Sequence, residues 1–468
     1  MNDTNYINFN NDLLKLNPSY RFTYGYKDKN TLSHIENQLD DTYINDLKKI
    51  IEKYKNNNHN ELQLQLSLIE FYLNNNINFL LFSSYYNFII QFEYLNEFIY
   101  PPNDDYKNSR INDFNMIVNT IIKKAKIGIS LNITFPKIII KNFLQQIKPL
   151  YKYQSLYKFI HKDYYPYCRT DIGLCYIKNG KDIYSFIIKE YIGFLDLTPA
   201  DIHNIGLNAI KNKSNSNYDD TNKKEELYKS RDDMFKDCFN FIKKSKKIIS
   251  SYFHKFSYSS IEIKAVPEEL ELNSSIAYFS VIDNIIYINL SYFNEITRNN
   301  LYSILIHECA HFYHYSYLYH FKVPKYKIYG YSNYALIEGF AYYFESLVND
   351  YNDDINENSL LRKLRLIVDT GINYYGWTYK QAYEYLNSYL PNKKKENKNE
   401  IDRYICIPGQ SLSYFIGKMH ILKLKDFYFF VNKNKTIKDF HHELLIEGFA
   451  SFITINKKFN YPYQYNNK

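Results

Sequence analysis

Apolar residues recur along most of the chain with the period of an α-helix. Leu47, Ile50, Ile51 and Tyr54 are three or four residues apart, so in a helix they would lie on one face. The same period returns in many later segments, at residues 62–73, 113–128, 136–147, 301–314, 335–347 and 379–389. The pattern therefore predicts a mainly α-helical protein.

One stretch has a different pattern, typical of β-structure. Residues 275–281 and 285–290 are two short runs rich in β-prone residues, and Asp283-Asn284 lies between them. Such a pair of polar residues between two apolar runs predicts a tight turn, so the runs are expected to form a hairpin. The hairpin would come shortly before the predicted helix at residues 301–314.

The edge of this hairpin offers a place for an extended peptide, because an unpaired strand can hydrogen-bond another backbone. Tyr278 and Asn289 are the candidate peptide-binding residues on the two strands. A hairpin that only packs against helices is equally compatible with the spacing.

The helical pattern is not interrupted by a second fold signature, so we expect one large domain over residues 31–460. Residues 1–30, which are polar and aromatic, are expected to form an irregular lead-in, and residues 461–468 a tail. Residues 211–226 have low complexity and predict a mobile surface loop. The most apolar stretch, residues 77–94, contains Ser, Asn and Gln, so a buried helix explains it better than a membrane span.

Composition narrows the function classes. The net charge is +8, but the basic residues are spread along the chain, so no nucleic-acid partner is expected. The first residues lack the features of a secretory signal. The five cysteines are odd in number and scattered, which fits a reducing compartment. These features predict a cytoplasmic protein without a membrane partner, and they leave the oligomeric state open.

The segment at residues 301–314 carries the strongest chemical signal, His307-Glu308-Cys-Ala-His311. In a helix, His307 and His311 lie one turn apart on the same face, where both imidazoles can bind one zinc ion. Glu308 then lies beside the metal and can take a proton from its bound water. The alternative is a buried helix whose histidines only hydrogen-bond to the backbone, because so short a pattern also arises by chance.

A third ligand is expected from the helical segment at residues 335–347. Glu338 and Glu345 are seven residues apart and therefore close to one face of that helix. We expect Glu338 to bind the metal and Glu345 to hydrogen-bond a ligand histidine. A solvated glutamate is the alternative for Glu338, but its neighbours are nearly all apolar and an unpaired carboxylate among them would be costly. Gly339 permits another backbone or the metal to approach closely.

Several ordered motifs closely resemble the family known as domain of unknown function 885 (DUF885). They lie at residues 169–173, 197–207, 338–345, 365–378, 403–418 and 439–448, and the resemblance runs from about residue 121 to the C-terminal end. This family is similar to helical zinc peptidases of the gluzincin type, related in architecture to thimet oligopeptidase and the Taq-type carboxypeptidases. The resemblance implies a large helical zincin with a small β-hairpin or sheet beside the metal-binding helix, one zinc ion per chain and peptide hydrolysis.

The chain departs from the usual family pattern at two places. The bacterial motif usually has a Pro-Gly pair and two more residues between its first and next histidine, whereas here the spacing is contracted. His314 is therefore an alternative second ligand, although helical geometry favours His311. The histidine that usually follows Thr-Gly-Ile is Asn373 here, which predicts slower turnover or altered specificity if that histidine assists catalysis.

The leading hypothesis is a zinc peptidase that acts on short peptides, with Glu308 as the general base. A phenol is expected to donate to the oxyanion, with Tyr414 as the first candidate and Tyr404 as the second. Asp369 is expected beside the ligands as a supporting carboxylate. Three arginines are candidates for binding a peptide carboxylate, although salt bridges within the helices are the more ordinary role for Arg362, Arg365 and Arg403. The alternative function is a catalytically silent scaffold or peptide-binding protein.

Overall fold

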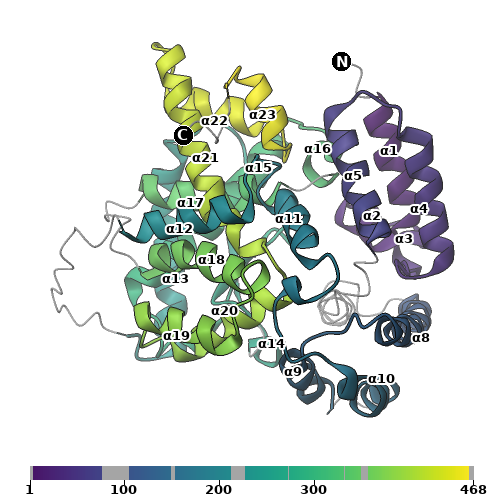
Figure 1. Ribbon diagram of the computed structural model, residues 1–468. Helices are drawn as coiled ribbons and strands as arrows, with labels where there is room; N and C mark the ends of the chain where they lie inside the picture. Colours follow the sequence, from purple (N-terminus) through teal and green to yellow (C-terminus); the bar gives the residue numbers. More distant parts are fainter. Residues whose placement is uncertain are drawn as a thin grey trace. The chain divides into compact units, whose positions relative to one another are not determined.

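The computed structural model describes residues 4–75, 105–148, 153–211, 227–271, 274–330, 333–348 and 357–462. It is mainly α-helical with one small sheet, which confirms the predicted fold class (Figure 1). The helix predicted at residues 77–94 lies outside the described residues, and so do residues 212–226 of the predicted loop and residues 463–468 of the tail.

The chain forms two compact units, although the sequence predicted one domain over residues 31–460. The first unit contains residues 1–187 and 368–409, and the second contains residues 188–367 and 410–468. Each unit therefore consists of two segments that are far apart in the sequence. Hydrophobic periodicity reports the secondary structure of each segment but does not say which segments pack together.

The N-terminal part of the first unit is helical from Thr4 onwards, so the prediction of an irregular lead-in over residues 1–30 was wrong. Tyr6, Phe9 and Leu14 are buried on one side of the first helix, although polar residues outnumber them. Helices α1, α4 and α5 lie side by side in Figure 1. The helices of this part are α1 (Thr4–Leu16), α2 (Pro18–Thr23), α3 (Lys29–Ser33), α4 (Asp41–Tyr54) and α5 (Asn60–Asn74).

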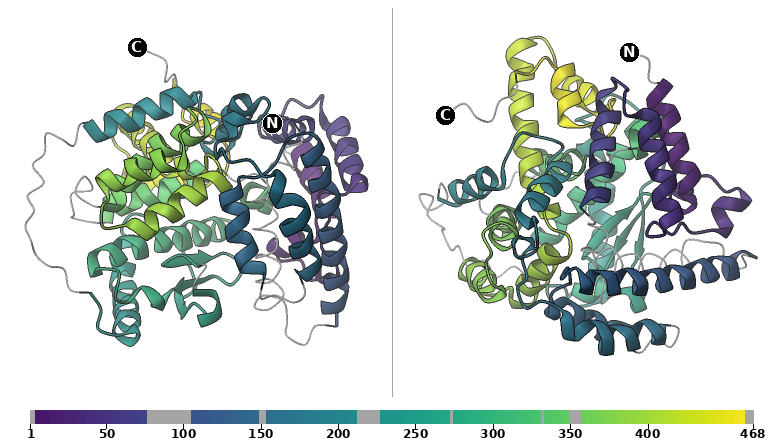
Figure 2. Two further views of the ribbon diagram at one scale, coloured as in Figure 1. Left: turned by 60° about the horizontal axis from the view of Figure 1, so that its bottom comes forward. Right: turned by 45° about the vertical axis from the view of Figure 1, so that its right-hand side comes forward.

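The remainder of the first unit is also built from helices, the longest of which is α8 (Figure 2). Asp28 and Asp40 begin α3 and α4 by accepting hydrogen bonds from backbone amides, and Thr378 with Gln381 forms a capping box on α19. The remaining helices of this unit are α8 (Lys107–Ser130), α9 (Lys137–Ile147), α10 (Gln154–Phe159), most of α11 (Gly180–Tyr191), α19 (Tyr379–Tyr389) and α20 (Lys394–Cys406).

The second unit carries a three-stranded sheet with the strand order β1–β3–β2. β2 (Ala277–Ser280) pairs antiparallel with β3 (Ile285–Ile288), which confirms the predicted hairpin, and Asn284 adopts a positive φ in the turn. β1 (Glu262–Ala265) joins β3 in parallel and was missed, because only four residues pair and most of them are exposed. β2 is therefore an edge strand.

Helices cover one face of this sheet and form the core of the second unit. Helix α15 (Arg298–His320) contacts β2, and α17 (Tyr334–Val348) packs against both α15 and α21 (Ser413–Val431). The other helices of the unit are α12 (Pro199–Lys211), α13 (Arg231–Ser250), α14 (Glu268–Glu271), α16 (Lys325–Tyr329), α18 (Glu357–Asn373) as far as residue 367, α22 (Ile437–Leu445) and α23 (Phe452–Lys458).

The crossing of α17 and α21 is unusually close. A Cβ atom at Gly417 would lie 1.8 Å from the carbonyl oxygen of Ala335, and one at Gly339 would lie 2.5 Å from the backbone of Gly417. Two glycines are required because only they let the two backbones meet at this distance. The close approach predicted at Gly339 is therefore the approach of another backbone.

Candidate metal centre

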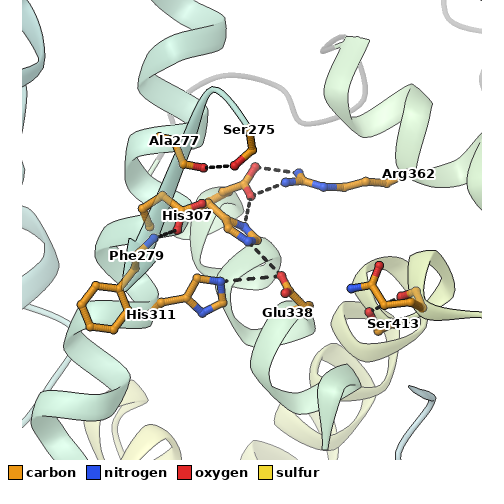
Figure 3. A network of polar contacts seen from close by, with 11 residues as sticks. Ser275, Ala277, Phe279, His307, His311, Glu338, Arg362 and Ser413 are labelled. Carbon is orange, nitrogen blue, oxygen red and sulfur yellow. Dashed lines mark hydrogen bonds and ion pairs between the residues drawn. The ribbon is translucent and has the colours of Figure 1, made fainter. Parts of the chain in front are cut away.

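The site is built on α15, which begins at a capped end and continues without a break through the metal-binding motif. Thr297 accepts a hydrogen bond from the amide of Asn300, and the helix then runs to residue 320. His307 and His311 are one turn apart, with ring centroids separated by 4.7 Å. Both side chains turn toward α17, where Glu338 faces them (Figure 3).

Three donor atoms lie close enough together to share one metal ion. The Oε2 atom of Glu338 lies 3.1 Å from Nε2 of His307 and 3.6 Å from Nε2 of His311. Ligands about 2.0–2.1 Å from a tetrahedral ion are about 3.3 Å from one another. The donor atoms all lie within 4.8 Å of one another, and they form the single such cluster of three or more found among the described residues. The side chains therefore fit a divalent metal ion.

A second carboxylate fixes the orientation of His307. Glu345 Oε1 lies 2.7 Å from Nδ1 of His307, and Ser303 donates to Oε2 of Glu345 at 3.0 Å. Arg362 donates two hydrogen bonds of 2.7 Å to the same carboxylate. The Nδ1–H of His307 thus points to Glu345, and Nε2 is directed toward Glu338, as a metal ligand requires.

The charges around His307 favour a cation at this place. Burial alone would lower the pKa of His307, but hydrogen bonds with Glu338 and Glu345 outweigh it and raise the pKa to about 10. Burial would raise the pKa of Glu338, yet the hydrogen bonds of His307 and His311 hold it well below its usual range. For Glu345, the charge of Arg362 and the bond to His307 likewise overcome burial and lower the pKa to about 2. A proton and a metal ion would compete for the same position.

Glu308 lies beside this cluster and contacts the edge strand. Its Oε2 atom accepts a hydrogen bond of 2.8 Å from the main-chain amide of Phe279 in β2. Burial raises the pKa of Glu308, and the nearby histidines offset only part of that effect. A carboxylate with a raised pKa is well suited to accept and return a proton near neutral pH.

Tyr414 is the phenol that the structure brings to the cluster. Its ring lies nearly parallel to the ring of His307, with 5.9 Å between the centroids, and the guanidinium of Arg365 lies 4.9 Å from the Tyr414 ring. Tyr404, the second candidate, is placed differently. It belongs to the first unit, is fully buried, and donates its hydroxyl to Glu400 at 2.7 Å. Both residues lie in helix α20, so the hydroxyl of Tyr404 has a structural partner within its own helix.

Two of the candidate peptide-binding arginines have structural partners. Arg362 is committed to Glu345 and also stacks over the ring of Tyr342 at 4.1 Å, so it supports the ligand histidine and does not bind a substrate. Arg403 belongs to the first unit, where it pairs with Glu400 at 3.4 Å in the same helix. Arg365 lies over the ring of Tyr414 and so is also near the cluster.

Asp369 and Asn373 form a separate network in the first unit. Asp369 accepts hydrogen bonds from the hydroxyl of Tyr184 at 2.8 Å and from the amide of Gly409 at 3.1 Å. Asn373 accepts one from the amide of Leu174 at 3.2 Å and donates one to the carbonyl of Tyr404 at 3.0 Å. These contacts join backbone turns to helices, so Asp369 is a structural carboxylate and the prediction that it supports the metal ligands was wrong.

The two candidate peptide-binding residues of the hairpin, Tyr278 and Asn289, both have structural contacts. Asn289 is fully buried and donates to the carbonyls of Glu271 and Ser274 at 2.7 and 3.0 Å, so it closes a turn and cannot reach a peptide. Tyr278 stacks on Tyr287 across the sheet with 5.2 Å between ring centroids. Phe279, the next residue, packs toward α15, and side chains alternate along a strand, so Tyr278 lies on the face away from the metal cluster.

His314, the alternative second ligand, is not part of the cluster, whereas His311 is. The His314 ring packs between Phe340 and Phe449, and neither of its nitrogen atoms has a hydrogen-bond partner among the described residues. Burial lowers its pKa to about 3. His314 is therefore a neutral core residue.

Sequence reasoning missed two groups of this site. Ser303 precedes His307 by four residues, and this spacing places both on one helix face, so the sequence could have indicated Ser303. The amide of Phe279 had no signal, because any residue other than proline carries the same donor.

The sequence profile of one family matches residues 148–457, about two thirds of the chain, and its description is "Bacterial protein of unknown function (DUF885)". The chain belongs to the DUF885 family. No curated protein matches the chain. The family assignment confirms the resemblance in the motifs, and it carries no statement about activity.

Two solved structures share the fold of this DUF885 protein over nearly its whole length. A proposed lipoprotein from Colwellia psychrerythraea has a TM-score of 0.80 with 18% sequence identity, and the match covers 98% of each chain. A proposed lipoprotein of unknown function from Shewanella oneidensis has a TM-score of 0.63 with 16% identity, covering 96% of this chain and 97% of the other. At these identities the likeness establishes the fold.

These structures correct the expected location. Both are described as proposed lipoproteins, a class of exported and membrane-anchored proteins, so the fold is no sign of a cytoplasmic protein and that prediction was wrong. Among the described residues, no helix has the length and apolar character needed to cross a lipid bilayer.

Proposed function

We propose that this DUF885 protein is a zinc-dependent peptidase that hydrolyses short peptides. The observation that carries the proposal is the set of three ligand atoms on α15 and α17 with Glu308 directly beside them. A protein that only bound metal for stability would need the ligands but not an acid–base group next to them.

The residues have separate tasks in this mechanism. His307, His311 and Glu338 would hold zinc, which lowers the pKa of a bound water when it is present. Glu308 takes a proton from the attacking water while the water oxygen bonds to the carbonyl carbon of the peptide. Glu308 then gives that proton to the amine nitrogen as the C–N bond breaks.

Two further groups serve the reacting peptide. Tyr414, whose ring stacks near His307, is the proposed donor to the oxyanion that forms during attack. The edge of β2 that faces away from β3 would pair with the peptide backbone, because the main-chain groups of Ala277 and Phe279 point there. Without a peptide, the Phe279 amide is used by Glu308 and the Ala277 carbonyl by Ser275, so a peptide would replace these two contacts. The proposal therefore assigns chemistry to α15 and peptide alignment to β2.

The test compares Glu308→Gln with wild type and with Glu384→Gln, a control at an exposed position of α19. A mixed peptide library is digested in the presence of zinc and read by mass spectrometry, and zinc is measured in the same samples. Glu308→Gln should retain zinc and lose about 10²–10⁴-fold in activity, while the control matches wild type.

Full activity of Glu308→Gln would refute this mechanism. A wild-type protein that takes up no transition metal after zinc reconstitution would refute the metal site itself. Zinc binding by wild type without any cleavage would support the silent peptide-binding alternative.

A further inference from the structure

A cavity lies next to the proposed site, between the hairpin and the C-terminal half of α15. Its volume is about 400 Å³, within the range of small-molecule pockets. The hairpin contributes Phe279 and Val281, and the segment before β1 contributes Tyr258. The α15 wall is formed by Tyr315, Ser316 and Tyr319.

Phe279 lines this cavity and also contacts Glu308, the proposed general base. The amide of Phe279 donates to Glu308 at 2.8 Å, while its ring lines the cavity and packs near Phe312 and Tyr315. Tyr315 and Tyr319 follow His311 by one and two helical turns, so the α15 wall continues directly from the metal ligands. The cavity is therefore adjacent to the place where a peptide bond would be cut.

An extended peptide along β2 would send side chains toward this cavity. Side chains of paired strands lie on the same face where residues are directly opposite, and they alternate every 3.3 Å or so along the strand. The ring of Phe279 points to the α15 side, so a peptide residue paired with it points to that side as well.

The chemistry of the lining selects the kind of side chain. The rings of Tyr258, Phe279, Tyr315 and Tyr319 line the cavity together with the imidazole of His320, and the lining residues that the structure describes include no carboxylate, lysine or arginine. Aromatic walls bind another aromatic ring through offset or edge-to-face contacts, while a lysine side chain would lose its hydration without a carboxylate to replace it. Tyr319 is 46% exposed, so the cavity can be entered from solvent.

We propose that this cavity is a specificity subsite for an aromatic side chain of the peptide, within about two residues of the bond that is cut. The inference rests on the proposed peptidase function and adds the substrate class to it. Peptides with Phe, Tyr or Trp at this position are the preferred substrates, and peptides with Lys there are the poorest.

The test fills the cavity from its helix wall. Ser316→Trp places an indole where the substrate ring would lie, and Ser388→Trp introduces the same residue at an exposed position of α19 as a control. Two peptide series, identical except for Phe or Ala at each position in turn, are assayed for kcat/KM. Wild type and Ser388→Trp should prefer Phe at one position by about 10- to 100-fold, and Ser316→Trp should reduce that ratio to near one.

A second variant guards against a folding failure of Ser316→Trp. Tyr319→Ala removes a partly exposed ring from the wall and should lower the same ratio by about tenfold with zinc content unchanged. A Phe preference that persists in both variants, or a wild type without any aromatic preference, would overturn the subsite.

Binding measurements separate this inference from the proposed function. Glu308→Gln with zinc is titrated by calorimetry with the best Phe peptide and its Ala counterpart, alone and combined with Ser316→Trp. Tighter binding of the Phe peptide that is lost with Ser316→Trp supports the subsite even if wild type cleaves nothing. Cleavage by wild type with equal binding of both peptides refutes the subsite and leaves the peptidase standing.

Discussion

Glu345 in the second unit and Asp369 in the first are both carboxylates on helices, and they are 2% and 0% exposed. Their surroundings differ in kind. Glu345 lies between the guanidinium of Arg362 and the imidazole of His307, each at 2.7 Å. Asp369 receives hydrogen bonds from the hydroxyl of Tyr184 and the amide of Gly409.

The difference shows that burial of a carboxylate does not reveal its function. Glu345 would influence a metal ion held by His307, because the two side chains share a proton, and Arg362 keeps Glu345 ionised. Asp369 instead fixes the backbone at Gly409, which has a positive φ of 85° and ends the turn after α20. The partners of a buried charge, and the elements they come from, distinguish the two roles.

The largest expected effect concerns the competition between zinc and the proton on His307. Because the pKa of His307 is raised to about 10 without metal, its Nε2 atom carries a proton at neutral pH that zinc must displace. Lowering the pH favours the proton. Zinc affinity should therefore fall by about tenfold per pH unit, or about 10³-fold from pH 9 to pH 6, measured with a competing chelator.

His254→Ala, which changes a histidine remote from the cluster in sequence, should show the same pH dependence. A zinc affinity that does not change between pH 6 and 9 would mean that His307 is neutral before the metal binds.

Removing the carboxylate of the first unit should damage stability and spare the metal. Asp369→Ala leaves the buried hydroxyl of Tyr184 and the amide of Gly409 without their acceptor, at about 1–3 kcal/mol each. We expect a loss of about 3 kcal/mol in the free energy of unfolding, measured with urea. Zinc bound per folded chain should match wild type. Loss of zinc from folded Asp369→Ala would contradict the structural role.

Removing the charge of Glu345, the carboxylate of the second unit, should weaken zinc binding. Glu345→Gln retains the shape of the side chain but weakens its hold on His307, and such changes typically cost about 10- to 100-fold in metal affinity. Zinc affinity is measured at pH 9, where competition from the proton is smallest. Glu443→Gln, at a partly exposed position of α22, is the control. Unchanged zinc affinity in Glu345→Gln would place the support of His307 elsewhere.

The smallest effect concerns His314, a buried histidine whose ring nitrogens have no hydrogen-bond partner in the part of the chain that the structure describes. Its pKa is lowered by burial to about 3, below the ordinary value of about 6.5. The unfolded chain takes up a proton as pH falls below about 6.5 while the folded chain does not, so stability is lost in that direction. His314→Leu should reduce this loss by about 1 kcal/mol between pH 7.5 and 5.5, measured by urea unfolding at both pH values. An equal loss in wild type and variant would show that His314 is protonated in the folded state.

The candidate ligand cluster was predictable in part, because the spacing of His307 and His311 is a property of a single helix. His307, His311 and Glu338 lie on two helices, and the pairing of Glu345 with His307 follows from the seven-residue spacing to Glu338. The hairpin was predictable for the same reason, since its two strands and turn are adjacent in sequence.

The wrong predictions came from contacts between distant segments. Asp369, Tyr404 and Arg403 lie in motifs near Tyr414 in the sequence, but they belong to the other compact unit. Asn289 adjoins the hairpin, yet its amide is used by the turn after α14. Residues 1–30 were predicted to be irregular because they contain few apolar residues. Three of these, Tyr6, Phe9 and Leu14, are nevertheless enough to bury one side of α1. The roles of these residues depend on their tertiary contacts, which a local sequence pattern does not report.

The contact between Gly339 and Gly417 extends the metal centre to a residue 79 positions along the chain from Glu338. Any side chain at Gly417 would meet the carbonyl of Ala335 at 1.8 Å, and relief would require α17 to move by more than an ångström. Glu338 would move with its helix, and a ligand displaced that far no longer matches the donor spacing of a zinc ion. In a library of random variants selected for loss of zinc, substitutions at Gly417 should therefore appear together with those of the ligands.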